Sequence, residues 1–446
     1  MKNKLKIIFS TAALIVGLSM QAQEKKPISL QEAIELGLKN SNQLKSNKAQ
    51  IEEANAELKE AEQKRLPDAK VSGSYMYLNN PNIDMKAKSN SGGGSGSGTS
   101  TEEIKINQAI YGIVNLSLPI YSGGRIKYGI ESARYLAEAA MLDADDEKEK
   151  VIQNLIEAYT NLYKAKKAVT LVQENLEQDK QRVNDLSNLE KNGLLARNDL
   201  LKAELQKSNT ESLLLDAENS WQLANVNMNL MLGLPDQTEL ILDSSFVHDI
   251  PELKPLEEYV QASLQNRNDL ASIDLKRKAA QTGVKATKGE MYPSLALTGG
   301  YIAADIPKFL TITNAVNVGA GISYDIGSLW KTKAKVKQAE ARVKQIEATE
   351  AMANDQVRLQ VNKNYIEVLS SKKKIDLYEK AVEQADENYR ITKNKFDNSL
   401  ATTTDLLDAD VAHLRAKLNF AFAKADLVVA YNNLLLSAGL LEETQQ

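Results

Sequence analysis

The chain of 446 residues contains no cysteine. It can therefore form no disulfide and offers no thiolate nucleophile. It also has no cysteine to bind a metal or to carry a lipid anchor. Histidine is almost as scarce, because only His248 and His413 are present, and neither has a second histidine at the spacing of a zinc site. The sequence shows no catalytic constellation, so we expect no enzyme activity, no cofactor and no bound metal.

Aromatic side chains and basic charge are also low. Phe, Trp and Tyr make up 5% of the residues, and the formal net charge is −4. Low aromatic content together with many Ala, Leu, Lys and Glu residues favours long helices over an aromatic-rich core. A nucleic-acid-binding protein would show a basic face, so we exclude nucleic acid as a partner.

Long hydrophobic runs are absent beyond the N-terminus. Residues 1–22 have the parts of a secretory signal peptide: three lysines, the apolar segment Ile7–Leu18 and a cleavage region with small residues that ends at Ala22. An uncleaved anchor is the alternative, but the apolar segment is short for a bilayer span. No later window of 18 apolar residues follows, so we expect an exported chain without a membrane helix.

Short segments with a strand pattern follow the helical stretches. The first helical pattern is capped by Ser29 and Glu32 and ends at Pro67. Alternation in the segments that follow predicts four strands, at 69–78, 109–119, 293–303 and 316–325. Their length of about ten residues suits tilted membrane strands. Within the first strand pair, the Gly/Ser run at 91–100 predicts a flexible loop.

The chain repeats its own pattern once. Pro67 and Pro293 lie 226 residues apart, whereas Asp199 and Asp405 lie 206 apart. Constant offsets on either side of one length change indicate an internal duplication. Each repeat is predicted as helix, strand, loop, strand, long helix, tip and returning helix. We divide the chain into a signal peptide (1–22), a first repeat (23–232), a linker (233–255) and a second repeat (256–446).

Four strands in one chain leave an open sheet. Four strands cannot close a barrel, and open strand edges cannot face lipid. If these are membrane strands, several copies of the chain must combine. The alternative is a soluble four-stranded sheet that caps a helical rod. The long helices carry stripes of Leu, Val, Ile and Ala, which require partners packed side by side.

Two polar breaks interrupt the longest helical patterns, at 192–201 and at 398–408. Each break contains an acid at the restart of the helix, Asp199 or Asp405, which we interpret as an N-terminal cap. We therefore predict that both breaks are tips of helical hairpins. The residues assigned to tip packing or to contact with a partner are Gly193, Leu194, Phe396, Ser399 and Leu400.

Two carboxylates at the second tip share one face of the helix, because Asp405 and Asp408 are three residues apart. In a symmetric trimer they would form a ring of negative charge at a narrow opening, and such rings select cations. Capping by Asp405 and solvent exposure of Asp408 is the simpler reading. The two roles are compatible.

The order of these elements resembles that of the TolC-type outer-membrane efflux proteins from Ile28 to Leu440. The segments that carry the resemblance are Leu30–Ile34, Leu66–Pro67, Leu118–Arg125 and Asp405–Ala409. The resemblance implies a mainly α fold with membrane β-structure. Three chains, with four strands each, would share one twelve-stranded β-barrel, continued by a long α-helical coiled-coil tunnel in the periplasm.

The resemblance also implies a function. The protein would be the outer-membrane exit duct of a tripartite efflux system in a Gram-negative bacterium, passively conducting drugs and other toxic small molecules. Its partners would be two further copies of itself, outer-membrane lipid, a periplasmic adaptor protein and an inner-membrane pump. A duct for type I protein secretion and a soluble periplasmic scaffold remain as alternatives.

By motif match, Asp405 and Asp408 correspond to the family's aperture carboxylates, and Asp199 corresponds to the acid at the first tip. The chain departs from the family pattern nearby. Phe396 stands where the family has Tyr, Ala401 stands where it has Arg, and Ser399 replaces a tip Gly. A latch built from that Tyr and Arg is therefore not expected, and packing or other polar contacts would close the aperture.

Overall fold

The computed structural model describes residues 25–79, 106–247, 250–307 and 309–441. The predicted signal peptide and the Gly/Ser run lie outside these residues. The chain divides into two compact units. The hairpin unit contains residues 1–50, 141–271 and 350–446, and the sheet unit contains residues 51–140 and 272–349. None of the helices in the described ranges is both long and apolar enough to cross a membrane.

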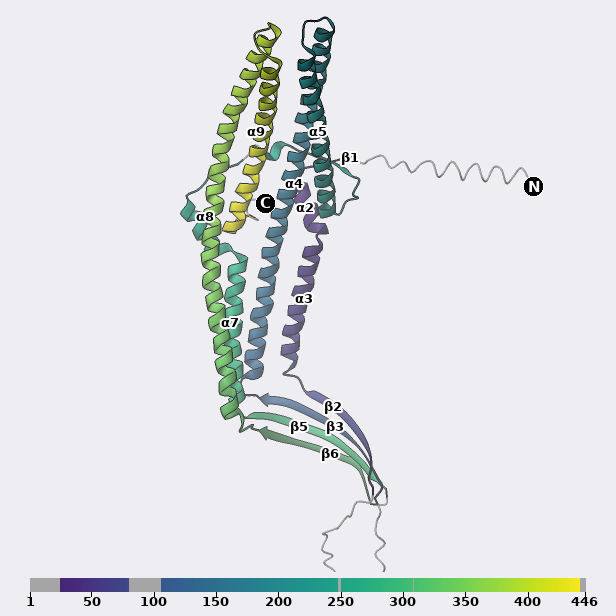
Figure 1. The fold of residues 1–446 in the computed structure, drawn as a ribbon. Helices are drawn as coiled ribbons and strands as arrows, with labels where there is room; N and C mark the ends of the chain where they lie inside the picture. The colour runs from purple at the N-terminus through teal and green to yellow at the C-terminus, as the bar shows by residue number, and fades with distance from the viewer. Residues whose placement is uncertain (1–24, 80–105, 248–249, 308, 442–446) are drawn as a thin grey trace, which may run out of the picture. The chain divides into compact units, whose positions relative to one another are not determined.

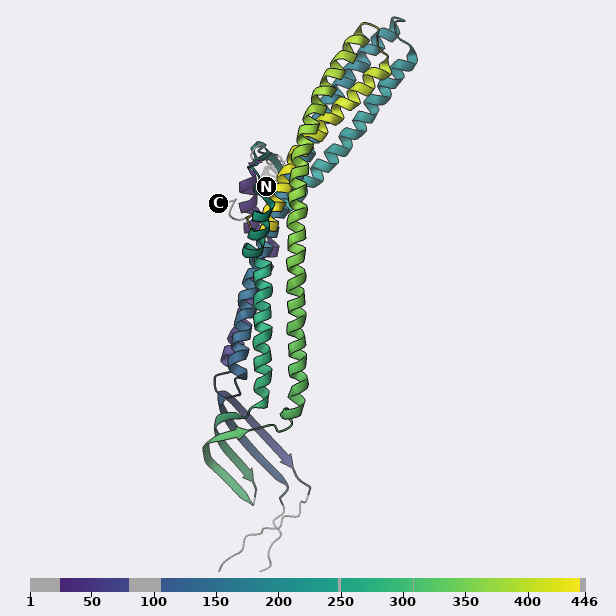
Figure 2. The same cartoon turned by 90° about the vertical axis from the view of Figure 1, so that its left-hand side faces the viewer.

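The hairpin unit is built from two helical hairpins whose helices run side by side (Figures 1 and 2). In each hairpin a long helix, which begins in the sheet unit, is followed by a shorter helix that runs in the opposite direction. The first hairpin is α4 (Arg125–Lys191) with α5 (Arg197–Leu232), and the second is α8 (Ser328–Asp397) with α9 (Thr403–Ala438). Shorter elements complete the unit: β1 (Lys25–Ile28), α2 (Leu30–Asn40), β4 (Glu239–Leu242), η2 (Ser245–Val247) and α6 (Leu256–Asn266).

Tyr159 of α4 lies at the centre of the apolar core of this unit and is fully buried. Its hydroxyl lies 3.0 Å from the carbonyl oxygen of Ile28 and 3.1 Å from that of Asp243. Burial raises the pKa of this hydroxyl far above its usual value. Strands β1 and β4 pair in parallel beside it. The segment predicted as a linker therefore contains a strand, which the sequence pattern did not reveal.

The two repeats place equivalent residues in equivalent contacts. A Cβ atom added to Gly233 would lie 3.1 Å from the Asn40 Cβ, and one added to Gly439 would lie 3.1 Å from the Asn266 Cβ. Asn40 and Asn266 are 226 residues apart, and the two glycines are 206 apart. The sequence offsets are thus matched by the packing at the ends of α5 and α9.

The sheet unit holds four antiparallel strands in the order β2-β3-β5-β6, so that β2 and β6 are its edges. The strands are β2 (Asp68–Tyr77), β3 (Gln108–Tyr121), β5 (Ser294–Ile306) and β6 (Leu310–Ser323). Most of α3 (Asn42–Gln63) and α7 (Asn268–Lys288), the turn η3 (Gly289–Met291) and the first parts of α4 and α8 complete the unit.

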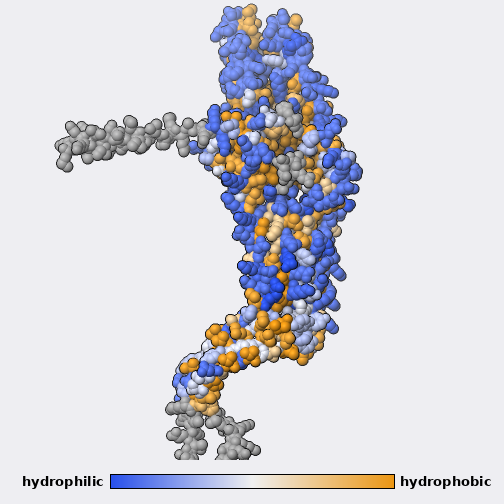
Figure 3. All heavy atoms as spheres, turned by 180° about the vertical axis from the view of Figure 1, so that it is seen from behind, coloured by the Kyte–Doolittle hydropathy of each residue, from blue (hydrophilic) through white to orange (hydrophobic). Residues whose placement is uncertain are grey.

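The register of the sheet sorts apolar and polar side chains onto opposite faces. Val71, Val114, Tyr301 and Val316 lie opposite one another in one row, and the next row contains Lys70, Asn115, Gly300 and Asn317. The apolar face is uncovered in one chain: Val71 is 81% exposed and Val318 is 88% exposed. Figure 3 shows the hydrophobic surface over this sheet. So much exposed apolar area requires a cover that one copy of the chain does not supply.

Three of the predicted strands have boundaries within three residues of those observed. The fourth prediction, 316–325, was wrong at its start, because β6 begins at Leu310. The reason is a register shift between Ile302 and Ala304, opposite Asn314, which adopts a φ of 59°. An irregularity of this kind breaks the strict alternation on which the sequence reading depends.

Candidate functional site

Both hairpin tips end in the same backbone motif. The N–H of Leu194 donates to the carbonyl of Leu189 (2.8 Å), and the N–H of Leu400 donates to that of Lys395 (2.7 Å). In the first tip the residue before the leucine is Gly193, with a φ of 74°. In the second tip it is Ser399, with a φ of 62°. The motif needs a left-handed residue here, and glycine adopts that conformation without strain.

We expect Ser399→Gly to stabilise the second tip by up to about 1 kcal/mol, because it removes the strain of a side chain in left-handed backbone. The reverse test is Gly193→Ala, which we expect to destabilise the first tip by a similar amount. Amide hydrogen exchange in the last turns of α8 and α4 measures both effects. Faster exchange at the second tip of Ser399→Gly would contradict this assignment.

The helix restart at the second tip is capped by Thr402, not by Asp405 as predicted. The Thr402 side chain accepts a hydrogen bond from the Asp405 N–H (3.2 Å), and Asp405 Oδ2 accepts from the Thr402 N–H (2.9 Å). This is a reciprocal capping box in which the acid takes the third helical position. Asp405 is exposed, and so is Asp408 one turn further on.

The hydrogen bonds from Thr402 lower the pKa of the Asp405 carboxyl. A lowered folded-state pKa contributes stability above the unfolded pKa, and this stability is lost as the pH falls through the folded value. The carboxylate therefore remains ionised at neutral pH. It offers negative charge at the tip and also holds the start of α9.

The acid at the first tip has a different environment. The residue before α5 is Ala196, which gives no side-chain cap, so the predicted capping role of Asp199 was wrong. Asp199 instead pairs with Lys202, whose Nζ lies 3.2 Å from its Oδ1. The same Nζ donates to the Thr404 hydroxyl (3.1 Å). Lys202 thus offsets the charge of Asp199 and joins the two tips.

The apolar residues at the tips divide into packed and exposed ones. Phe396 packs against the buried side chains of Leu186 and Leu200, which belong to the other hairpin. Leu194 and Leu400 are 74% and 76% exposed. The phenyl ring therefore helps to hold the hairpins together, whereas the two leucines present apolar surface at the ends of the hairpins.

A buried ionic cluster, further from the tips, connects the four helices of the two hairpins. Its ion pairs join Arg182 Nη1 to Asp179 Oδ1 (2.6 Å) and to Asp410 Oδ2 (3.0 Å). Thr210 donates to Asp179 Oδ2 (2.6 Å), and Arg182 Nη2 donates to the Tyr389 hydroxyl (3.3 Å). These residues lie on α4, α5, α8 and α9, so the cluster ties one hairpin to the other.

The cluster holds two carboxylates and one guanidinium away from water. Asp410 is 0% exposed and Asp179 is 1% exposed. Burial, and then the nearby charge of Asp410, raise the pKa of Asp179. Burial alone would lower the pKa of Arg182, but its hydrogen bond and charge interaction with Asp410 shift it upward. Among the described residues, Arg182 is the cation that forms ion pairs with both acids, and Asp410 Oδ1 has no hydrogen-bond partner.

The sequence reading missed this cluster, although a signal was present. Asp179 and Arg182 lie on the apolar stripe of α4 that also contains Val172, Leu176 and Leu186, all of them buried. Charged residues at such positions are costly unless they are paired. The partner across the hairpins, Asp410, is 228 residues away from Arg182. Nothing in the local pattern could identify it.

The histidine on α9 has a packing role. His413 stacks on Tyr389 with ring centroids 5.3 Å apart, and its Nε2 lies against the Asp386 carboxylate. In the part of the chain that the structure describes, no group of His, Cys, Asp and Glu is arranged to hold a metal ion. The site therefore offers fixed charge, apolar surface and interhelical ties.

Comparison with known proteins agrees with this architecture. The chain is 20% identical over 335 residues to the outer membrane efflux protein BepC of Brucella suis, covering 74% of this chain and 72% of BepC. It is 24% identical over 329 residues to the alkaline protease secretion protein AprF of Pseudomonas aeruginosa, covering 70% and 67%. The crystal structure of the outer membrane protein VceC of Vibrio cholerae superposes with a TM-score of 0.76 at 18% identity, covering 92% of this chain and 96% of VceC.

The profile of one family matches both halves of the chain, at residues 33–234 and 259–440. The match includes the long helical hairpins and the four strands. It confirms the resemblance on which the sequence interpretation relied. The chain therefore belongs to the outer membrane efflux protein family.

Proposed function

We propose that three copies of this chain assemble into one exit duct, with twelve strands closing a barrel and the helical hairpins forming a tunnel. The observation that carries the proposal is the four-stranded sheet, which has an exposed apolar face and unpaired edges at β2 and β6. In lipid an unpaired edge is strongly unfavourable, so β6 of one copy would pair with β2 of the next.

This proposal builds on the family to which the chain belongs. Members are outer-membrane channels, and the chain lies in the outer membrane with its helical part in the periplasm. The face with Val71 and Val318 then contacts lipid, and the face with Lys70, Asn115 and Asn317 lines the lumen. A soluble scaffold would leave the apolar face exposed to water, so we set that alternative aside.

In the proposed duct the hairpin tips form the periplasmic opening. The carboxylates of Asp405 and Asp408 would line it and give it a preference for cations. The exposed leucines at the tips, Leu194 and Leu400, would contact a periplasmic adaptor that connects the duct to an inner-membrane pump. The buried ionic cluster and Phe396 would replace the Tyr and Arg latch that the sequence lacks.

The favoured cargo is small toxic molecules, by analogy with the efflux relatives. Protein secretion is the second candidate, and a specific observation favours it: AprF, which covers a similar share of the chain as BepC, is named for the secretion of a protease. The division of the chain into two repeats around the segment at 233–255 fits either cargo, since both would pass through the same lumen.

The test removes the gene for this chain from its host. We expect deletion cells to retain a fluorescent cationic dye several-fold longer than the parent strain, and expression of the intact chain to restore dye export. Dye retention and the proteins of the culture medium are measured together. Unchanged retention combined with loss of one secreted protein would overturn efflux in favour of secretion.

Assembly can be measured in the same cells, because the chain has no native cysteine. One cysteine is introduced on β2, at Ser72 or Ser74, and a second on β6, at Asn317 or Gly319. Cross-linking should then join up to three chains and no more. Cross-linked products larger than three chains, or a monomer that conducts alone, would contradict the trimer.

A further inference from the structure

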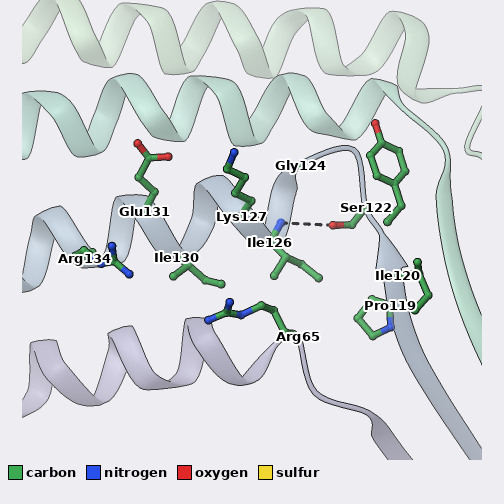
Figure 4. Close-up of a pocket in the computed structure, with 11 residues that line it drawn as sticks. Arg65, Pro119, Ile120, Ser122, Gly124, Ile126, Lys127, Ile130, Glu131 and Arg134 are labelled. Carbon is green, nitrogen blue, oxygen red and sulfur yellow. Dashed lines mark hydrogen bonds between the residues drawn. The ribbon is translucent and has the colours of Figure 1, made fainter.

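The sheet unit contains a cavity of about 610 Å³ where β3 ends and α4 begins. Figure 4 shows Arg65, Ile126 and Ile130 pointing into the space between α3 and α4, with Arg134 further along α4. Lys127 and Glu131, the remaining charged residues of the wall, point away from α3 (Figure 4). Both guanidiniums line this cavity, together with the apolar side chains of Ile126 and Ile130.

Neither guanidinium is paired with a carboxylate of the described residues. Arg65 and Arg134 form no ion pair and no side-chain hydrogen bond there, and both are exposed. The fold does not require a cation at the first position, because residue 291, which is 226 residues after Arg65, is Met. Two unpaired guanidiniums beside apolar side chains suit an anionic group that carries its own apolar part.

The cavity lies at the edge of the apolar face of the sheet. After the register shift at the end of β3, Tyr121 pairs with Leu295, which in turn pairs with Ile322, and Ile322 is 78% exposed. Tyr121 and its neighbour Ile120 also line the cavity. A tyrosine at the end of a lipid-facing strand marks the level of the headgroups in membrane barrels. In the proposed barrel, the arginines would therefore lie at the depth where a membrane presents phosphate.

We propose that this cavity binds an anionic phospholipid of the periplasmic leaflet, with the phosphodiester held between Arg65 and Arg134. The acyl chains would lie over Ile120 and Tyr121 toward the apolar face of the sheet. The Ser122 hydroxyl, in the turn that precedes α4, can donate to the same phosphate. This inference depends on the sheet lying in the outer membrane, but not on what the duct conducts.

The test variant is Arg65→Met/Arg134→Gln, and the control variant is Lys337→Gln/Arg342→Gln. The first substitution copies the residue that the second repeat already has at the equivalent position, so folding should be retained. The control removes two exposed cations from α8, away from the cavity lining. Full-length protein is purified in nonionic detergent and titrated with dioleoyl phosphatidylglycerol, and bound lipid is counted by native mass spectrometry.

We expect the cavity variant to bind dioleoyl phosphatidylglycerol about tenfold or more weakly than the parent protein, and the control variant to bind it as the parent does. Equal binding by the cavity variant would overturn the site. A second arm adds inorganic phosphate at the same concentration as the lipid. Displacement of the lipid by free phosphate would show a simple anion site and overturn the lipid assignment.

Channel conductance of the same preparations separates this inference from the proposed function. If the cavity variant binds no lipid but still conducts, the duct is intact and the lipid site is separate from it. A parent protein that conducts but binds no phosphatidylglycerol would sink the lipid site alone. A parent protein absent from the outer-membrane fraction would contradict both.

Discussion

Arg182→Met is expected to lower the local free energy of unfolding of the hairpin unit by roughly 3–5 kcal/mol at pH 7. The change leaves Asp179 and Asp410 buried with no counter-charge in the cluster, and it removes the hydrogen bond to Tyr389. Amide hydrogen exchange in α8 and α9 near residues 389 and 410 measures the local opening directly. Exchange that stays at the parent rate would show that the cluster does not tie the hairpins.

The matched control is Arg390→Met on α8. Arg390 forms an ion pair with Glu387 that resembles the buried pair in spacing but lies at the surface. Water screens exposed pairs of this kind, and their loss changes stability little. A large effect of Arg390→Met would mean that removing any guanidinium from these helices is destabilising, and burial would not be the cause.

The pH dependence of the cluster has a definite sign. The pKa of Asp179 is raised above its unfolded value, so its favourable contribution is present below that unfolded value and is lost as the pH rises through the folded one. Asp179→Asn imitates the protonated acid. At pH 7 it should therefore leave α4 and α9 as stable as in the parent protein or more stable, and the gain should disappear below about pH 4.

Arg182→Met should also respond to acid. The Asp179 carboxyl, whose pKa is raised by burial, can take up a proton, which removes one of the buried charges, so the destabilisation should shrink as the pH falls. Hydrogen exchange of this variant at pH 5 and pH 7, corrected for the intrinsic exchange rate, measures the difference. A destabilisation of equal size at both values would point to lost packing of the arginine side chain and not to unpaired charge.

How far the sequence predicts this fold depends on the distance between the residues that decide each feature. The tips were predictable because their signals are local: Gly193 supplies a left-handed residue, and polar residues surround each helix restart. Thr402 was also readable, since a threonine three residues before an acid is a capping-box pattern. The prediction chose Asp405 because an acid at a helix restart is itself a favoured cap.

Features that depend on distant residues were not predictable in the same way. The pairing of β1 with β4 joins Lys25 to Glu239, and neither four-residue strand has a distinctive pattern. The buried ionic cluster joins residues from four helices, and only the spacing of Asp179 and Arg182 within an apolar stripe hinted at it. The other elements were predictable from the duplication, because both repeats contain the same order of helix and strand patterns.

The second large effect concerns the proposed aperture. Asp405→Asn/Asp408→Asn is expected to weaken block of the channel by a trivalent lanthanide ion about tenfold or more, and to reduce its preference for cations over anions. In a trimer these residues would supply a ring of six carboxylates, and converging negative charge concentrates cations by at least this factor. Asparagine keeps an oxygen that can accept from Thr402, so the start of α9 should persist. Single-channel conductance in planar bilayers, with the ion added on the periplasmic side, measures block and selectivity.

The first tip provides the control for this experiment. Asp199→Asn removes a carboxylate whose charge is already offset by Lys202 at 3.2 Å, so lanthanide block should change little. Lanthanide block of the Asp408→Asn channel should lie between that of the parent and that of the double variant. The reason is that the Asp405 carboxylate stays ionised, since it accepts hydrogen bonds from Thr402. The contrary result is a lanthanide ion that blocks the double variant as strongly as the parent channel but blocks Asp199→Asn less strongly. In that case the acid at the first tip lines the aperture. Asp405 would then act only in holding the start of α9.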